Sequence, residues 1–354
     1  MPIETPTDLR DHLHTAISIE MATIPAYLYA LYSFEDQSAL PPRLIRSIVV
    51  EEMLHAALST NILLAVGGEP EWSSDRYFPN YPGELPHHRP RIDLDLAPVS
   101  IDLVRDVLLV IEQPEMHSAP AEGDDYASLG QFYHSIETSI ERMADRFDLF
   151  SDPQLERQMS DSSFYRPVQF DAEDSGNLAP IESTPDACDA ISVIVHQGEG
   201  LSDERWADPE HKELTHYHKL LLLADGKAAL GSVLPVPINP RTANYPAELQ
   251  QVSDLFNAAY RATYLALDDM FSVGGNQGTA VGRLYGLMTG VLGPVARYLV
   301  TVDLPDGGVA APTFEWFEFS GDPWAELSAL ANRIARDHPD LQTVATVADN
   351  LVNT

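Results

Sequence analysis

Cysteine is almost absent from this sequence, since Cys188 is the only one in 354 residues. One thiol cannot form an internal disulfide, and it cannot supply the four thiolates that hold an iron–sulfur cluster. The sequence also contains no C-x-x-C-H motif of the kind that attaches heme covalently. We therefore expect a reducing compartment and no metal site built from thiolates.

Basic residues are also scarce, with 21 Lys and Arg against 54 Asp and Glu, so the formal net charge is −33. Such a chain repels the phosphates of nucleic acids and anionic membrane surfaces. The first residues lack a basic segment followed by an apolar core, and no uninterrupted apolar run reaches about 18 residues. Hydrophobic residues still make up 44% of the chain, which is typical of a globular protein with a large core. We expect a cytoplasmic protein.

Strand-like alternation is rare, whereas apolar residues recur at helical spacing along most of the chain. Two long helices are predicted at residues 7–34, with Thr7 as N-cap, and 43–68; because a short turn joins them, they should form an antiparallel hairpin. A long irregular crossover rich in Pro, Trp and Tyr follows. Further helices are predicted at residues 100–115, 127–148, 185–200, 208–226, 247–272, 280–300 and 323–338. The predicted fold class is all-α, with a helical bundle at residues 1–226 and a second, mainly helical region at residues 227–354.

One carboxylate, Glu20, lies in an otherwise apolar stretch of the first helix, and the second helix contains the motif Glu52-Met53-Leu54-His55. Residues at i and i+3 share a helix face, and the face of Glu52 and His55 is apolar, so both are predicted to point inward. Glu51 lies next to that face and is predicted at the rim or in solvent. An inward Glu opposite an inward Glu-x-x-His is half of the di-metal site of four-helix bundles, and these donors favour iron or manganese.

The second half of such a site is less regular in this sequence. Glu137 is predicted to face inward by its spacing from Tyr133, and Glu199 lies at a similar height on the partner helix of that pair. We expect Glu199 to replace the Glu of a second Glu-x-x-His and His216 to supply the imidazole from beyond a short insertion. Three residues remain rivals for these positions: Glu112, Glu213 and His196.

The segments around these residues resemble the ferritin-like domain of the iminophenyl-pyruvate dimer synthase family, found in enzymes that couple tryptophan-derived imines in violacein and rebeccamycin biosynthesis. The matching segments are "IEMATIPAYLYALYS", "EEMLHAALSTNILLAVGGEP", "IEQPE", "QGEG" with "ELTHYHKL", and "APTFEWFEF". The resemblance implies a ferritin-like four-helix bundle, a site for one or two non-heme irons, and oxidative chemistry on a small substrate. Glu20, Glu52 and His55 match the family pattern residue by residue, whereas His196 stands where an acidic residue is expected. The chain is much shorter than the tryptophan-coupling enzymes, so their dimer synthase activity is not carried over.

The sequence thus predicts an oxidoreductase in which two irons, with manganese as the alternative metal, activate O2 or peroxide to oxidise a small aromatic or amino-acid-derived substrate. The expected partners are that substrate and O2, with no nucleic acid and no membrane, and a homo-oligomer is left open. Residues 227–354 are expected to cover one mouth of the bundle, with "FEWFEF" at residues 314–319 lining a pocket. The alternative function is a non-catalytic ferritin-like protein that binds or handles iron. The predicted metal ligands are Glu20, Glu52, His55, Glu137, Glu199 and His216.

Other residues of redox or metal-binding type are assigned structural places. The tyrosines beside the predicted ligands, including Tyr27 and Tyr133, are expected in the core rather than in electron transfer. Five further histidines are predicted to lie on the surface: His12, His14, His87, His88 and His117.

Overall fold

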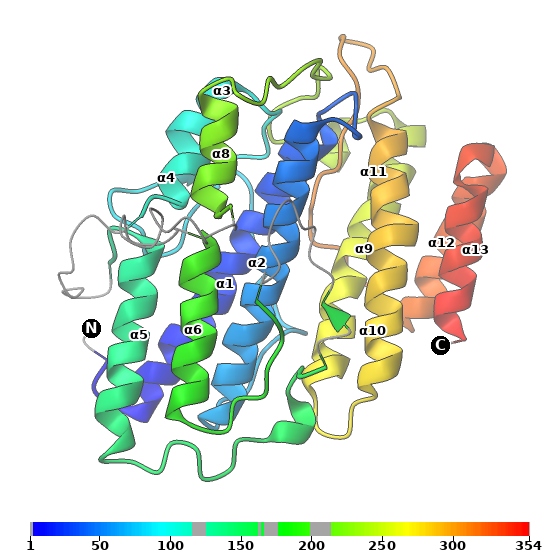
Figure 1. The fold of residues 1–354 in the computed structure, drawn as a ribbon. Coiled ribbons are helices and arrows are strands. Elements are labelled where there is room, and N and C mark those ends of the chain that lie inside the picture. Colours follow the sequence, from blue (N-terminus) through cyan, green and yellow to red (C-terminus); the bar gives the residue numbers. More distant parts are fainter. Residues whose placement is uncertain (1–2, 115–124, 162–163, 166–175, 199–213, 354) are drawn as a thin grey trace.

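Helices form most of the computed structural model, which describes residues 3–114, 125–161, 164–165, 176–198 and 214–353. In the first region they are α1 (Pro6–Tyr32), α2 (Leu40–Ala65), α3 (Ile101–Leu103), α4 (Leu109–Ile111), α5 (Leu129–Ala144), α6 (Thr184–Gly198) and α8 (His216–Ala224). In the second they are α9 (Ala247–Phe271), α10 (Gln277–Tyr285), α11 (Gly293–Leu299), α12 (Pro323–Asp337) and α13 (Gln342–Val352). Two π-helical segments, η1 (Val104–Leu108) and η5 (Gly286–Leu292), join α3 to α4 and α10 to α11, and short 3-10 turns lie at Leu155–Arg157, Thr242–Asn244 and Pro339–Leu341. The predicted all-α class is confirmed (Figure 1).

The helices α1 and α2 form the predicted hairpin and pack along their length (Figure 1). Thr5 rather than Thr7 caps α1, because its side chain accepts a hydrogen bond from the Asp8 amide while the Asp8 carboxylate accepts one from the Thr5 amide. The helix continues through Pro25 to Tyr32. α2 ends just before Gly67, whose φ of 72° is readily adopted by glycine. Two long uninterrupted helices therefore form one wall of the bundle.

The other two columns of the bundle are each made of two helices. Figure 1 shows α4 above α5 in one column and α8 above α6 in the other. α5 packs on α1 and α6, while α6 and α8 both pack on α2. The predicted helix at 208–226 is observed from His216 onward, and its residues 208–213 lie outside the described residues. Among the described residues, α4 ends at Ile111 and α5 begins at Leu129, while α8 begins at His216.

The crossover at residues 69–99 is mostly irregular, as predicted, and contains one short antiparallel hairpin. Its strands β1 (Gly83–Glu84) and β2 (Asp93–Leu94) pair Gly83 with Leu94 and Glu84 with Asp93. The crossover contributes to the core mainly through aromatic side chains, since Trp72, Tyr77 and Phe78 are buried.

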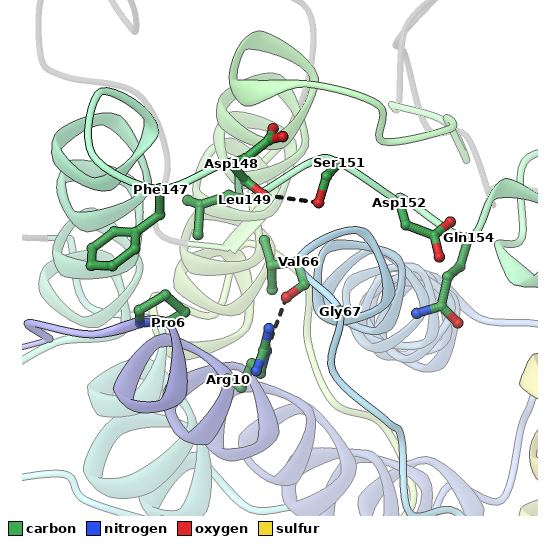
Figure 2. A pocket seen from close by; sticks show the side chains of 10 residues that line it. All are labelled: Pro6, Arg10, Val66, Gly67, Phe147, Asp148, Leu149, Ser151, Asp152 and Gln154. Atoms are coloured by element: carbon green, nitrogen blue, oxygen red, sulfur yellow. Dashed lines mark hydrogen bonds between the residues drawn. The ribbon is translucent and has the colours of Figure 1, made fainter.

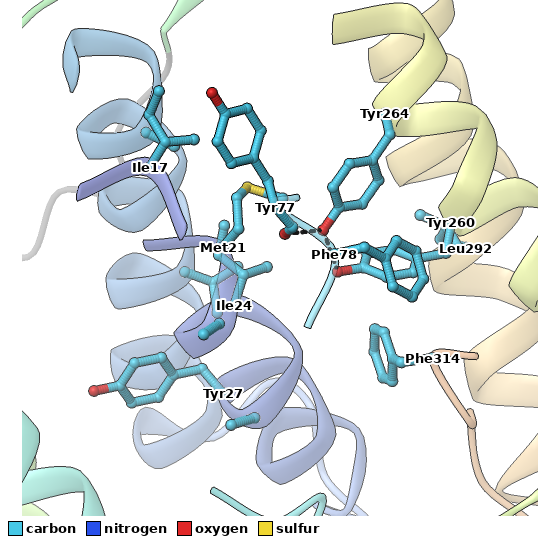
Figure 3. Packing of buried hydrophobic residues seen from close by; sticks show 14 of the residues in the cluster. Ile17, Met21, Ile24, Tyr27, Tyr77, Phe78, Tyr260, Tyr264, Leu292 and Phe314 are labelled. Atoms are coloured by element: carbon cyan, nitrogen blue, oxygen red, sulfur yellow. Dashed lines mark hydrogen bonds between the residues drawn. The ribbon is translucent and has the colours of Figure 1, made fainter. Parts of the chain in front are cut away.

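These aromatic side chains join the bundle to the second region. Figure 3 shows Tyr77 and Phe78 between α1 and the tyrosines of α9. The ring of Phe78 lies 5.3 Å from that of Tyr260 and 5.1 Å from that of Tyr264, distances typical of packed aromatic pairs. Buried apolar side chains of both regions form one continuous cluster. The boundary between residues 226 and 227 stays a prediction.

The second region lies to one side of the α1–α2 hairpin in Figure 1, and Figure 3 shows the aromatic side chains of the crossover between α1 and α9. Phe314 of the "FEWFEF" segment is 2% exposed and packs at 4.8 Å from the ring of Phe256, so this residue belongs to the core. The predicted last helix is observed as α12, and α13 follows it unpredicted, although Val344, Ala348 and Leu351 have helical spacing and are buried.

Among the described residues, α2 is long and apolar enough to cross a membrane by length and composition alone, which the search for uninterrupted apolar runs missed. In the structure, 83% of its most apolar window is buried inside the protein. It packs on α1, α6 and α8 and carries two residues of the site described next.

Candidate metal centre

Five acidic and imidazole side chains meet inside the bundle, and each is at most 2% exposed. In the described part of the chain they form two groups, Glu20–Glu52–His55 and Glu52–Glu112–His216, and the donor atoms of each group lie within 4.8 Å of one another. Glu52 belongs to both groups. The arrangement therefore offers two adjacent positions for metal ions that share one carboxylate.

Two kinds of local structure present these side chains. Glu52 and His55 share the inward face of α2, as their spacing predicts. Glu112 is the C-cap of α4, directly after the π-helical segment η1, and His216 is the first residue of α8, whose N-cap is Thr215. A π-helical turn is wider than an α-helical turn and is frequent at functional sites. Helix ends therefore supply two of the five residues.

In the first group, His55 faces the carboxylates with its Nδ1 atom. This atom lies 3.5 Å from Glu20 Oε2 and 4.0 Å from Glu52 Oε1. The other ring nitrogen, Nε2, lies 2.9 Å from Gln197 Oε1 of α6, an acceptor, so Nε2 carries the proton. The hydroxyl of Tyr133 on α5 donates to Glu20 Oε1.

In the second group, His216 Nδ1 lies 3.0 Å from Glu52 Oε1 and 3.4 Å from Glu112 Oε2. This atom is buried and has no hydrogen-bond partner among the described residues. The outer oxygens of the two carboxylates are held by hydroxyl groups of α1: Tyr27 donates to Glu112 at 2.5 Å and Thr23 donates to Glu52 at 2.6 Å.

The interior of the site is electrostatically unfavourable without a cation. Burial raises the pKa of Glu20 to about 7, and burial together with the Glu20 charge raises the pKa of Glu52. Burial lowers the pKa of His55. Burial alone would also lower the pKa of His216, but the carboxylates around it, Glu112 first, outweigh that effect and raise this pKa well above its usual range. Protons thus compensate the buried charges, and divalent ions can replace them.

These residues fit a pair of divalent metal ions. Two donors that bind one ion at about 2.1 Å and at roughly a right angle are about 3 Å apart, and the His216 Nδ1 distances to Glu52 and Glu112 are 3.0 and 3.4 Å. The unpartnered Nδ1 atom is the donor that a metal ion would satisfy. Carboxylate and imidazole donors together suit iron or manganese.

The structure brings together four of the six predicted ligands, Glu20, Glu52, His55 and His216, and adds Glu112 from the rivals. The inward placement of Glu137 is wrong: its side chain is 29% exposed and lies 3.6 Å from His134 Nδ1. The buried positions of α5 include Tyr133, Ile136, Ile140 and Met143, and residue 137 falls at the edge of this buried stripe.

The remaining candidates are Glu199, Glu213 and His196. Glu199 and Glu213 lie outside the described residues. His196 is a half-buried residue of α6 that belongs to neither group of donors. That any of the predicted residues binds metal stays a prediction.

The prediction that Glu51 lies at the rim or in solvent is wrong, because Glu51 is only 3% exposed. Its Oε2 atom lies 2.9 Å from His216 Nε2 and also pairs with Lys219 Nζ, which is equally buried. Burial alone would raise the pKa of Glu51, but the positive charges of Lys219 and His216 lower it. The available signal was a lysine one helical turn after His216, in "HYHKL".

Comparisons with known proteins show the family to which this fold belongs. A family model described as Ferritin-like matches residues 13–225. The chain belongs to the ferritin-like family. A crystal structure of a ferritin-like protein from Caulobacter vibrioides superposes with a TM-score of 0.61 at 27% identity, covering 81% of this chain and 96% of that one.

The chain is also 25% identical over 418 aligned positions to dichlorochromopyrrolate synthase from Lentzea aerocolonigenes, covering 99% of this chain. It spans only 40% of the length of that enzyme. The resemblance drawn from the motifs is thereby confirmed. This ferritin-like chain is related to an enzyme of biosynthesis.

A separate hollow of about 300 Å³ lies where α1 begins and α2 ends (Figure 2). Its floor contains Arg10, whose Nε donates to the carbonyl of Val66 at 2.9 Å, and its rim is the loop at residues 147–154. Arg10 is about 15 Å along α1 from Glu20, at 1.5 Å of rise per residue. The hollow contains no imidazole and no buried carboxylate, so it is not part of the centre.

Proposed function

We propose that this protein is an iron-dependent oxidoreductase that uses O2 or peroxide to oxidise a small aromatic or amino-acid-derived substrate, as in natural-product biosynthesis. The observation that supports this most directly is the meeting of two donor groups at Glu52, with His216 Nδ1 left without a hydrogen-bond partner among the described residues. The relationship to a synthase supports an enzyme. Since the chain spans 40% of that synthase, its particular reaction is not part of the proposal.

The side chains of this protein would bind the two metal ions and orient the groups that hold them. Glu20 and His55 would hold one ion, Glu112 and His216 the other, and Glu52 both. When bound, iron supplies the electron transfer to O2 that no amino-acid side chain provides. The hydroxyl groups of Thr23, Tyr27 and Tyr133 each donate to a carboxylate of the centre, which fixes the direction of its remaining lone pairs. The burial of all five donors keeps water away from the reaction.

The surroundings of the reaction belong to the same proposal. The net charge of −33 supports a protein that acts on small molecules in the cytoplasm and contacts neither nucleic acid nor an anionic membrane. The partners are then the substrate and O2, and a homo-oligomer is compatible with them. Manganese is the alternative metal, because it accepts the same donors.

Metal analysis of protein purified without oxygen tests the proposal first. We expect about two irons per chain, and O2 uptake accompanied by loss of substrate when ferrous protein is offered aromatic amino acids and their imines. A protein that binds neither iron nor manganese contradicts the proposal. A protein that consumes O2 with iron but oxidises none of these compounds would instead be an iron-handling protein.

The double variant Glu52→Ala/His55→Ala links the activity to this centre. It should lose both iron and O2 uptake, whereas Glu137→Ala, which alters an acidic residue outside the centre, should keep both.

A further inference from the structure

A buried ion pair lies directly behind the second metal position. The side chains of Glu51 and Lys219 are each 4% exposed, and Lys219 Nζ contacts the same Glu51 Oε2 atom that lies 2.9 Å from His216 Nε2. His216 and Lys219 are three residues apart on α8, so both reach one carboxylate of α2. Burying two charges carries a large desolvation cost that their attraction does not always repay, so stability alone is a weak reason for this pair.

The Glu51–Lys219 pair determines which ring nitrogen of His216 carries the proton and which one faces the metal position. Because Glu51 accepts from Nε2, the proton of a neutral His216 ring stays on Nε2, and the lone pair of Nδ1 points at Glu52 and Glu112. Lys219 Nζ contacts the same Oε2 atom of Glu51, so this carboxylate is engaged with α8 and away from the metal position.

The other imidazole has a different partner. His55 Nε2 bonds to the side-chain amide oxygen of Gln197, which is uncharged. The centroids of the two rings lie 5.4 Å apart with 28° between their planes, and the Nδ1 atom of each ring faces Glu52. A carboxylate behind a histidine makes the ring a stronger metal donor than an amide does, and such outer partners change metal affinity by about 10- to 100-fold.

We propose that Glu51 and Lys219 are positioning residues that make the Glu52–Glu112–His216 position bind metal more tightly than the Glu20–Glu52–His55 position, so that the centre fills in a fixed order. This inference rests on the proposed function in one respect, that the centre binds metal. It goes beyond that function by assigning the order of filling and the residues that cause it.

Titration of the full-length, metal-free protein with Mn²⁺, followed by calorimetry and electron paramagnetic resonance, tests the order. We expect two binding steps at least tenfold apart in affinity. Glu20→Gln touches only the weaker position and should affect only the second step. This variant identifies which step belongs to which position.

The decisive variant is Glu51→Gln combined with Lys219→Met, which removes both charges and leaves no unpaired buried ion. It should weaken binding at the Glu52–Glu112–His216 position by about 10- to 100-fold and leave binding at the Glu20–Glu52–His55 position unchanged, so that the gap in affinity closes or reverses. A general loss of structure would weaken both steps, so the selective effect separates positioning from folding. Glu137→Gln removes one acidic charge outside the centre and should change neither step.

Gln197→Glu provides the converse test and leaves the Glu51–Lys219 pair intact. It places a carboxylate behind His55 and should strengthen the second step, which narrows the gap between the two. The proposal is overturned if Mn²⁺ does not bind, if the double variant weakens both steps equally, or if Gln197→Glu leaves the gap unchanged. Because Mn²⁺ binding needs no oxidation, ordered binding in a protein that oxidises nothing would refute the proposed enzyme activity alone.

Discussion

The two halves of the bundle deliver their metal-binding candidates in different ways. The wall of α1 and α2 consists of uninterrupted helices, and its residues Glu20, Glu52 and His55 lie on helix faces in mid-helix. The opposite wall consists of interrupted columns, and Glu112 and His216 lie at helix ends. Periodicity places a residue within a continuous helix, whereas the position of a residue at a helix end depends on where that helix begins or stops.

The largest effect should come from the residue that the two halves share. Glu52→Gln removes a donor from both metal positions, so we expect bound iron to fall from about two per chain to nearly none and O2 uptake to fall at least a hundredfold. The metal-free variant should melt at or above the temperature of the metal-free parent, because one of several crowded buried acids is gone. Elemental analysis and thermal melting measure both. A variant that keeps two irons would show that the positions do not share Glu52.

A matched pair of acid-to-amide changes compares the helix end with the helix face. Glu112→Gln should lose one of the two irons and about a hundredfold in O2 uptake, while Glu137→Gln should match the parent because its side chain is partly exposed and paired with His134. Iron content and O2 uptake are measured side by side. Loss of iron from Glu137→Gln but not from Glu112→Gln would support Glu137 as the metal ligand, as the periodicity predicts.

A substitution at Gly198, where α6 lies close to Glu112, should have a smaller effect on metal binding. A Cβ atom at Gly198 would stand 3.4 Å from Glu112 Oε2, so the branched side chain of Gly198→Val should displace that carboxylate. We expect about a tenfold weaker Mn²⁺ affinity at the first binding step. Gly278→Ala, at a helical glycine of α10 whose added Cβ meets only Asn276 at 3.6 Å, is the control and should bind Mn²⁺ like the parent.

The hydroxyl that holds Glu20 should matter less than any ligand. Tyr133→Phe removes one hydrogen bond to a buried carboxylate, and a bond to a charged group contributes about 1.5–3 kcal/mol. The metal-loaded protein should lose stability within that range in urea and keep two irons. Loss of an iron would mean that Tyr133 is needed for binding itself.

The smallest effect concerns the uninterrupted wall away from the centre. Burial, followed by the nearby Arg76 charge, lowers the pKa of His14 to about 4. The unfolded chain takes up a proton at about pH 6.5, so between pH 6.5 and 4 it binds more protons than the folded one, and stability falls as the pH is lowered. The full pKa shift of His14 would correspond to a loss of folding stability of roughly 3 kcal/mol, and partial solvent screening reduces this loss to about 1–2 kcal/mol. The raised pKa of Glu20 acts in the opposite direction over the same range, so the comparison with His14→Gln isolates the effect of His14. In urea unfolding at pH 7 and pH 4.5, the metal-free parent should lose about 1–2 kcal/mol of stability relative to the metal-free His14→Gln variant.

Residues of the site could be predicted from the sequence where the helical spacing of apolar residues runs through one continuous helix. The face shared by Glu52 and His55 and the height of Glu20 follow from spacing alone. Glu112, by contrast, follows a π-helical segment, whose different hydrogen bonding interrupts the periodicity from which a face is inferred. His14 was expected on the surface and is 7% exposed, because the crossover brings Tyr77 over it from far along the chain.

By itself, the sequence determined the helical class, the α1–α2 hairpin and the inward face of α2, since these depend on spacing within about one or two helices. Only the tertiary structure decided that Glu51 is buried and that Lys219 meets it. The physical reason is that Glu51 has polar partners on α8, which lies more than 150 residues along the chain. A charged side chain can be buried where an oppositely charged group lies beside it. The tertiary structure decides whether such a group from a distant part of the chain is there.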